Sequence, residues 1–334
     1  MTEQRRYKVA MIARERKDVP EWVRSRLDAS ADLDVAYGHC RTEAELLAIA
    51  ADADMIWTMG PNEALTPAVL PKLSRCRAIF RSGSGMDGYP VAEASALGIA
   101  MCNSPESISE AVAEHAVSLL FSLVRQIPFS DRRMRGDQGC RVSLRWHLSG
   151  STLGLVGFGR IGSRVCEMMV GFRMTVLVHD PFTPPDQVRR YGAQPVGLDE
   201  LLARADFLSL HCPLTDQTRH LIGAKELAAM KKGALLVNTS RGAVVDETAL
   251  IDALRNGQLG GAALDVTDPE PPSANSPLFA LPNVILTPHN AAISGQFERN
   301  FWEASIQVVS ECRSGDVDTH CMNRRERATR PTTT

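Results

Sequence analysis

The sequence predicts an α/β protein with two doubly wound parallel sheets. Short apolar runs with strand character alternate with short helical patterns over most of the 334 residues. That alternation is typical of parallel sheets covered by helices on both faces. The length corresponds to about two domains. A glycine-rich turn follows an apolar run near residue 157, whereas we expect no phosphate-binding glycine fingerprint in the first hundred residues, where the glycine-containing loop 81–88 is the exception in composition. We therefore expect two α/β domains with different tasks.

The first domain is expected to begin with a buried strand close to the N-terminus. Strands are predicted at 7–12, 33–37, 53–58, 78–81 and 99–102, and helices at 20–27, 43–51, 67–73 and 91–97. The loop 81–88, RSGSGMDG, follows a strand. Its glycines fit either a plain turn or backbone amides left bare to face a small anion.

The second domain is expected to follow a long apolar-periodic helix at 106–123, which carries Glu114 and His115. A polar, basic stretch at 132–147 then leads to the glycine-rich turn. Further strands are predicted at 153–156, 174–178, 207–211, 234–238, 261–266 and 284–287, with helices at 161–169, 198–204, 225–230, 247–256 and 296–312. The tail 322–334 is polar and unpatterned, so we expect disorder at its end. Its four arginines fit a solvated tail better than nucleic-acid binding.

Composition argues against several classes of partner. The net charge of −2 gives no general attraction to nucleic acid or an anionic membrane. No apolar run approaches the roughly 20 residues needed to cross a bilayer, and the charged N-terminus does not fit a signal peptide. The eight cysteines have no CxxC or zinc-type spacing, so we expect reduced thiols, no metal and a cytoplasmic location. These cysteines are Cys40, Cys76, Cys102, Cys140, Cys166, Cys212, Cys312 and Cys321.

The glycine-rich turn has the spacing of a dinucleotide-binding motif. Gly157, Gly159 and Gly162 form GxGxxG between an apolar run and a helical pattern. Such glycines permit a tight turn and let the backbone approach a pyrophosphate at the helix N-terminus. Asp180 ends the next strand, where a carboxylate can accept from both ribose hydroxyls. A glycine-rich connector in some other α/β unit is the alternative, but the surrounding pattern favours a Rossmann domain.

Polar side chains follow three later strands of the same domain. Arg241 comes after 234–238, Glu270 after 261–266 and His289 after 284–287. Carboxyl ends of parallel strands meet at one edge of the sheet, where ligands bind. Arginine suits a planar carboxylate, and histidine transfers protons near neutral pH beside a supporting carboxylate. Each alone is better explained as a surface arginine, a loop acid or a loop histidine; together they favour an active site.

These residues lie in blocks that resemble the NAD-dependent D-2-hydroxyacid dehydrogenase family, which includes glycerate, hydroxypyruvate, phosphoglycerate and D-lactate dehydrogenases. The resemblance is densest from 103 to 294. The blocks are LGLVGFGRIG (153–162), HDP (179–181), HCPLTDQTRHLIG (211–223), LVNTSRGAVVDETALIDAL (236–254), ALDVTDPEP (263–271) and TPHNAA (287–292).

The resemblance implies a role for each matching residue. Arg241 would orient the substrate, Glu270 would support His289, and His289 would be the acid/base. The amides of Ser84 and Gly85 would bind the substrate carboxylate. NAD would be held by Gly157, Phe158, Gly159, Arg160, Ile161, Gly162, Asp180, His211, Pro213, Thr239, Ser240, Arg241, Asp265 and His289, with Asp265 at the nicotinamide carboxamide. A homodimer is also implied.

Some positions depart from the family pattern. Thr267 replaces a common aromatic residue, Asn290 replaces a frequent apolar one, and Gly88-Tyr89-Pro90 replaces the usual continuation after Asp87. These departures leave the specific hydroxy acid open. An NAD-sensing corepressor on the same scaffold is the alternative function. Formate chemistry is disfavoured, because it needs no acid/base histidine.

The complete expectation is an enzyme with two domains. Residues 1–103 plus 296–334 would form a flavodoxin-like substrate domain, and 104–295 the NAD-binding Rossmann domain, with the catalytic cleft between them. The enzyme would interconvert a small 2-oxo acid and a D-2-hydroxy acid by hydride transfer. The expected partner is this small molecule, with no nucleic acid or membrane.

Overall fold

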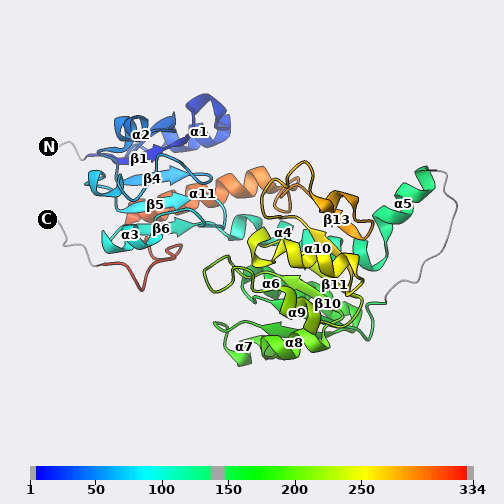
Figure 1. Ribbon diagram of the computed structural model, residues 1–334. Coiled ribbons are helices and arrows are strands. Elements are labelled where there is room, and N and C mark those ends of the chain that lie inside the picture. Colours follow the sequence, from blue (N-terminus) through cyan, green and yellow to red (C-terminus); the bar gives the residue numbers. More distant parts are fainter. Residues whose placement is uncertain (1–4, 137–146, 329–334) are drawn as a thin grey trace. The chain divides into compact units, whose positions relative to one another are not determined.

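The computed structural model describes residues 5–136 and 147–328 (Figure 1). The chain divides into two compact units, 1–108 with 295–334 and 109–294. The sequence predicts divisions after 103 and 295. Helix α4 (Glu106–Val124) begins in the first unit and continues into the second, so the observed division falls within a helix rather than in a loop.

The first unit contains a six-stranded sheet in the order β2-β3-β1-β4-β5-β6. Its strands are β1 (Tyr7–Met11), β2 (Ala13–Arg14), β3 (Leu33–His39), β4 (Met55–Thr58), β5 (Ala78–Arg81) and β6 (Ala100–Asn103). All neighbours pair in parallel except β2, which runs antiparallel to β3. Without β2, this is the doubly wound order of flavodoxin-like sheets, as predicted.

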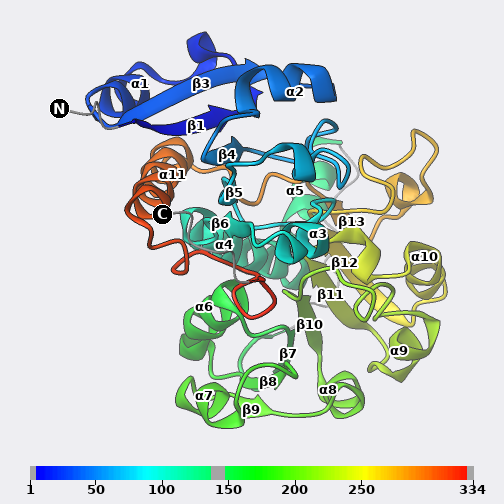
Figure 2. The ribbon, with the colours of Figure 1, turned by 90° about the vertical axis from the view of Figure 1, so that its left-hand side faces the viewer.

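Helices cover both faces of this sheet (Figure 2). In β4, Met55 and Trp57 face one core while Ile56 faces the other, because successive strand side chains alternate. The first core is closed by α1 (Glu21–Asp28) and α11 (Phe297–Ser314), the second by α2 (Glu43–Ala50), η2 (Leu70–Lys72) and α3 (Val91–Ala96). A further 3-10 turn, η1 (Arg16–Asp18), precedes α1.

The second unit contains a seven-stranded, fully parallel sheet in the order β13-β12-β11-β10-β7-β8-β9. Its strands are β7 (Thr152–Val156), β8 (Thr175–His179), β9 (Gln194–Pro195), β10 (Phe207–Leu210), β11 (Ala234–Asn238), β12 (Leu259–Leu264) and β13 (Val284–Leu286). The order reverses between β7 and β10, as in a Rossmann sheet. The predicted fold class is thus confirmed.

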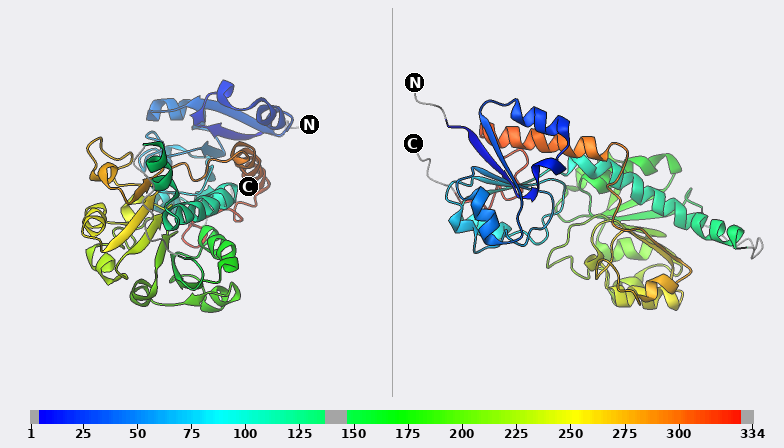
Figure 3. Two further views of the ribbon diagram at one scale, coloured as in Figure 1. Left: turned by 90° about the vertical axis from the view of Figure 1, so that its right-hand side faces the viewer. Right: turned by 90° about the horizontal axis from the view of Figure 1, so that it is seen from above.

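Helices also flank the second sheet on both faces (Figure 3, left). One core includes α4, α6 (Arg160–Met169) and α7 (Pro185–Arg190). The other includes α8 (Leu198–Arg204), α9 (Ala224–Ala229) and α10 (Glu247–Arg255). Short 3-10 turns are η3 (Val170–Phe172), η4 (Gly242–Val244) and η5 (Pro277–Ala280).

The structure corrects several sequence-based boundaries. The helix expected at 67–73 is only the 3-10 turn η2, whose second residue is Pro71. The strand expected at 261–266 ends at Leu264, which leaves Asp265 in the following loop. The basic stretch expected at 132–147 begins inside a helix that the sequence pattern missed, α5 (Ile127–Arg135), and its residues 137–146 lie outside the described ones.

Helix α4 is the long apolar-periodic helix expected at 106–123. It is the one helix among the described residues whose length and composition would allow it to cross a membrane. However, 44% of its apolar 18-residue stretch is buried inside the protein. Its residues Ala113, Ala116 and Leu120 pack in the core of the second unit. Core helices of soluble proteins have the same length and composition.

Candidate active site

The glycine turn after β7 is shaped by close backbone packing. Gly157 has a φ of +93°, and a Cβ there would lie 2.6 Å from the backbone nitrogen of Cys212. A Cβ on Gly162 would lie 2.2 Å from the Gly157 carbonyl oxygen. By contrast, no described atom lies within 4 Å of a Cβ built on Gly159. The first and third glycines therefore close the turn, and the second leaves open backbone at the start of α6.

Asp180 is tied to this turn. Its carboxylate accepts hydrogen bonds from the backbone N–H groups of Phe158 at 2.7 Å, Phe182 at 2.8 Å and Thr183 at 3.1 Å. The Phe158 side chain is 2% exposed and packs edge-on against Tyr191, so it lies in the core. Asp180, at the end of β8, therefore stabilises the glycine turn. Its carboxylate can still accept a further hydrogen bond from a hydroxyl group.

Two polar atoms at the same edge of the sheet are buried without a hydrogen-bond partner in the described structure. They are the Nδ1 of His211, which follows β10, and the Oγ1 of Thr239, which follows β11. Burial lowers the pKa of His211 to about 4, so its ring is neutral at physiological pH. Ser209 Oγ lies 2.9 Å from the other ring nitrogen. Orphaned buried polar groups are costly, and a bound dinucleotide would satisfy them.

The turn after β11 holds Arg241 in a fixed backbone frame. The Asn238 side chain donates to the Arg241 carbonyl at 2.8 Å and accepts from the Ser240 N–H and hydroxyl at 3.0 and 2.8 Å. The Arg241 guanidinium donates to the Ser240 carbonyl at 2.7 Å. A Cβ on Gly242 would lie 2.0 Å from the Thr267 carbonyl oxygen, so only glycine lets this turn meet the loop after β12.

The loop after β13 is anchored by Asp265, whose side chain is 1% exposed. Its carboxylate accepts from the Thr287 hydroxyl at 2.6 Å and from the N–H groups of Asn290 and Ala291, each at 3.0 Å. Its backbone carbonyl accepts from the His289 N–H at 2.9 Å. His289 itself has a φ of +50°, an uncommon value that this network maintains.

The structure brings His289 and Glu270 together. Nδ1 of His289 contacts Oε1 of Glu270, and the two side chains are 48% and 39% exposed. With Nδ1 engaged, Nε2 is the nitrogen available for proton exchange. Arg241, Glu270 and His289 follow β11, β12 and β13, so all three lie at the carboxyl edge of one parallel sheet. The other residues predicted to contact NAD in this unit follow β7, β8, β10, β11 or β12, at the same edge.

In the first unit, the loop after β5 is held from several sides. Ser82 is 1% exposed, accepts from Trp57 Nε1 at 2.7 Å and contacts the Ser305 hydroxyl at 2.8 Å. Asn103 donates to the Ser84 carbonyl at 2.7 Å. These bonds tie the loop to β4, β6 and α11 of the same unit.

Comparison with known proteins decides the family. A model of the D-isomer specific 2-hydroxyacid dehydrogenase NAD-binding domain matches residues 117–291. Glyoxylate reductase from Aeropyrum pernix is 37% identical over 287 residues, covering 84% of this chain and 85% of its own. The chain belongs to the D-isomer specific 2-hydroxyacid dehydrogenase family. It is an NAD-dependent oxidoreductase.

Other relatives of this dehydrogenase differ in length and substrate. D-3-phosphoglycerate dehydrogenase from Methanocaldococcus jannaschii is 35% identical over 89% of this chain, which spans only 56% of that relative. The crystal structure of D-lactate dehydrogenase from Aquifex aeolicus, complexed with NAD and lactic acid, superimposes with a TM-score of 0.78. It is 30% identical and covers 93% of this chain and 96% of its own.

Sequence reasoning missed the residues that support the dehydrogenase site. Asn238, Thr287 and Asn103 hold the three loops described above, and His115 Nε2 on α4 lies 3.2 Å from the Thr287 hydroxyl. Asn238 and Thr287 belong to blocks already recognised, but nothing in the sequence says which way their side chains turn. Within the described residues, no group of three His, Cys, Asp or Glu side chains could hold a metal ion.

Proposed function

We propose that this dehydrogenase interconverts a small 2-oxo acid and the corresponding D-2-hydroxy acid, with His289 as the acid/base. The observation that carries the proposal is the His289–Glu270 contact at the carboxyl edge of the NAD-binding sheet. In the direction of reduction, Nε2 of protonated His289 gives a proton to the carbonyl oxygen. Glu270 holds the orientation of that ring through its contact with Nδ1. Bound NADH supplies the hydride to C2.

Arg241 is proposed to bind the substrate carboxylate and carbonyl. Its fork of N–H donors matches two oxygens, and the bond to the Ser240 carbonyl presents the guanidinium in a defined orientation. The amides of Ser84 and Gly85 are proposed as further donors to the carboxylate. The bonds that Asn103 and Ser82 make within the first unit support this role, because they fix the loop backbone.

NAD is proposed to lie along the edge that begins at the glycine turn. The open backbone at Gly159 fits the pyrophosphate, and the N–H groups that begin α6 (Arg160, Ile161 and Gly162) are its donors. His211, Pro213, Thr239 and Ser240 would line the nicotinamide half. Asp265 is proposed to lie close to the carboxamide. Because its carboxylate already accepts three bonds from the chain, the structure supports a role in holding the His289 loop more directly than a cofactor contact.

The experiment that tests the reaction is a panel of 2-oxo acids with NADH. Glyoxylate, hydroxypyruvate and pyruvate cover small side chains, and a branched 2-oxo acid serves as the bulky comparison. We expect turnover of at least one small member and a D configuration in the product. Tight NADH binding with no turnover of any member would contradict the proposal and favour the sensor alternative.

The enzyme is expected to prefer NADH over NADPH by about tenfold or more in kcat/KM. Asp180 repels a 2′-phosphate, and the next residues, Pro181-Phe182-Thr183, bring no arginine to offset that repulsion. Asp180→Asn is the informative variant, since it removes the charge while keeping one oxygen, which can still accept from the Phe182 and Thr183 amides although the bond from the Phe158 amide to the other oxygen is lost. Steady-state kinetics with both cofactors should show a smaller ratio of kcat/KM for NADH to kcat/KM for NADPH in the variant.

The surface control is Asp186→Asn, which should keep the wild-type ratio. Equal use of NADPH by the wild type would contradict the assignment.

We propose that the protein is a homodimer. Helix α5 has no buried residue in the monomer, and its Ile127 and Met134 are 56% and 66% exposed. Exposed apolar side chains on one helix fit a surface covered by a second subunit. Light scattering should give a dimer for the wild type and a monomer for Ile127→Asp/Met134→Asp. Val170→Asp, at a residue 61% exposed elsewhere in the unit, should stay dimeric. A monomeric wild type would refute the proposal.

A cytoplasmic location is also proposed. It rests on the near-neutral charge and on the seven described cysteines, all of which are free thiols. Cell fractionation would test it.

A further inference from the structure

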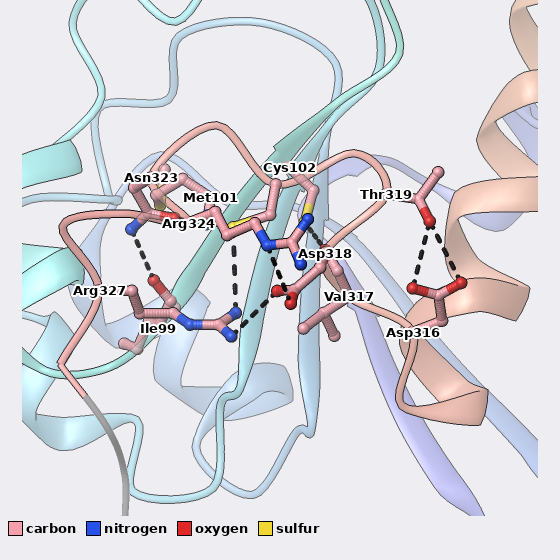
Figure 4. A network of polar contacts seen from close by, with 11 residues as sticks. Ile99, Met101, Cys102, Asp316, Val317, Asp318, Thr319, Asn323, Arg324 and Arg327 are labelled. Atoms are coloured by element: carbon pink, nitrogen blue, oxygen red, sulfur yellow. Dashed lines mark hydrogen bonds and ion pairs between the residues drawn. The ribbon is translucent and has the colours of Figure 1, made fainter.

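The chain beyond α11 packs along β6 as an additional antiparallel segment. The Asn103 N–H donates to the His320 carbonyl at 3.2 Å, and the Met322 N–H donates to the Met101 carbonyl at 2.8 Å. Asn323 is 1% exposed; its side chain accepts from the Met101 N–H at 2.9 Å and donates to the Ile99 carbonyl at 3.0 Å (Figure 4). The polar tail expected from the sequence is therefore docked on the sheet as far as the described residues extend.

These hydrogen bonds define the register of two cysteines. Cys102 of β6 and Cys321 are directly opposite each other in an antiparallel bridge. The flanking residues exchange the hydrogen bonds, so the two cysteines form a non-hydrogen-bonded pair. In such pairs the Cα atoms lie about 4.5 Å apart and the side chains approach most closely. That separation is within the range of about 4.4–6.8 Å found for disulfides.

We propose that Cys102 and Cys321 form a reversible disulfide that fastens the C-terminal segment to β6. Both are free thiols in this structure. The Cys102 side chain is fully buried, whereas Cys321 is partly exposed, so an oxidant would reach Cys321 first. The inference concerns the first unit and does not depend on the proposed reaction.

The oxidant would be a small-molecule disulfide. The Cys321 thiolate attacks one sulfur of the oxidant, whose S–S bond breaks to release one thiol and leave a mixed disulfide. The Cys102 thiolate then attacks Cys321 Sγ and releases the second thiol. Overall, the two protein thiols lose two electrons and two protons. The oxidant gains both and becomes two thiols.

The surroundings make this exchange slow at neutral pH. A hydrogen bond with the Cys102 thiol and burial raise the pKa of Cys321, although the Arg327 guanidinium, 3.9 Å from its sulfur, acts in the opposite direction. A hydrogen bond with Cys312 on α11 raises the pKa of Cys102. Because only the thiolate reacts, the rate should rise about tenfold per pH unit between 7 and 9.

Arg327 also holds the segment in place. It donates to the Asp318 carboxylate at 3.1 Å, which closes the turn that contains Cys321 (Figure 4). The Cys102 thiol lies 3.7 Å from the Val317 carbonyl at the other end of the same turn. The two cysteines are thus fixed opposite each other before any oxidation.

The test is incubation of the full-length protein with oxidised glutathione at pH 8.5, followed by non-reducing proteolysis and mass spectrometry. We expect a peptide pair linked through Cys102 and Cys321, released by a reducing agent, and loss of two thiols per chain. The melting temperature of the oxidised protein should rise by about 5 °C. Cys321→Ser should abolish the linked pair and the rise, whereas Cys40→Ser, at a buried cysteine elsewhere in the unit, should keep both.

Three results would contradict the proposal: a disulfide between Cys102 and Cys312, glutathione retained on Cys321, or no loss of thiols after prolonged oxidation. Cys321 is partly exposed, so its serine variant should fold; unchanged circular dichroism is the check. If that variant were unfolded, Cys321→Ala would replace it under the same criteria.

Discussion

Replacing His289 by asparagine should lower kcat by at least about 100-fold in both directions, the usual scale for removing a general acid/base. Asparagine is chosen because it tolerates the positive φ of this position better than alanine does. The Asp265 bonds to the Asn290 and Ala291 amides do not involve the imidazole, so the loop should keep its shape. Steady-state rates of reduction and oxidation are the measurement.

NADH affinity separates lost chemistry from lost folding. Titration of the His289→Asn protein with NADH should give a Kd within about threefold of the wild-type value, a difference under 1 kcal/mol. His39→Ala, at an exposed histidine of the first unit, should retain full activity. Near-normal turnover in His289→Asn would remove the histidine from the mechanism.

The role of Glu270 is tested by Glu270→Gln, which keeps the shape and removes the charge. Without the carboxylate in contact with Nδ1, the imidazole loses the partner that holds its orientation for proton transfer. The kcat of reduction and of oxidation should therefore fall, by less than the roughly 100-fold expected for His289→Asn. Unchanged kcat values would make Glu270 an ordinary loop acid, while the assignment of His289 would stand.

Replacing Arg241 by lysine should remove most activity, with a fall of about 10- to 100-fold in kcat/KM for a 2-oxo acid. A charge-assisted hydrogen bond contributes about 1.5–3 kcal/mol, and an ammonium cannot reproduce the bidentate fork. Lysine also loses the bond that the guanidinium makes to the Ser240 carbonyl, which sets its direction. Initial rates over a range of substrate concentration would separate the effects on KM and kcat.

Neutral substrates provide the internal comparison for Arg241. Amides or esters of the same 2-oxo acid should be poor substrates of the wild type, and the preference for the acid should shrink in Arg241→Lys. Arg219→Lys, at an exposed arginine of the same unit, should behave as the wild type does. Full activity of Arg241→Lys would return Arg241 to a structural role.

Much of the fold was readable from patterns that are local in the chain. The strands 78–81 and 234–238 have the predicted bounds, because short apolar runs between turn residues leave little choice of structure. Helix α5 was missed, since none of its residues is buried and its contribution to a core is the partly buried Phe129. Strand β2 has two residues, too few to produce a pattern.

For the candidate site, too, some features could be predicted from the sequence and others could not. The glycine spacing and the order of Arg241, Glu270 and His289 along the chain predict an NAD-binding edge, because carboxyl ends of parallel strands meet there. The contact between His289 and Glu270 brings together residues 19 positions apart in sequence, as the pattern anticipates. The bonds from Asp180 to the Phe158 amide and from Asp265 to the His289 loop depend on side-chain directions that no spacing reports.

The sequence alone establishes the fold class and the family and predicts the edge of the sheet at which the chemistry is proposed, because periodicity and motif spacing act over a few residues. The contacts that stabilise the loops at that edge are visible only in the tertiary structure. A buried carboxylate such as Asp265 must find donors wherever the fold brings them, here in a loop 25 residues away. The same holds for the C-terminal segment, whose polar sequence predicts a solvated tail. Its Asn323 is buried because the edge of β6 offers a backbone donor and acceptor, and this docking places Cys321 opposite Cys102.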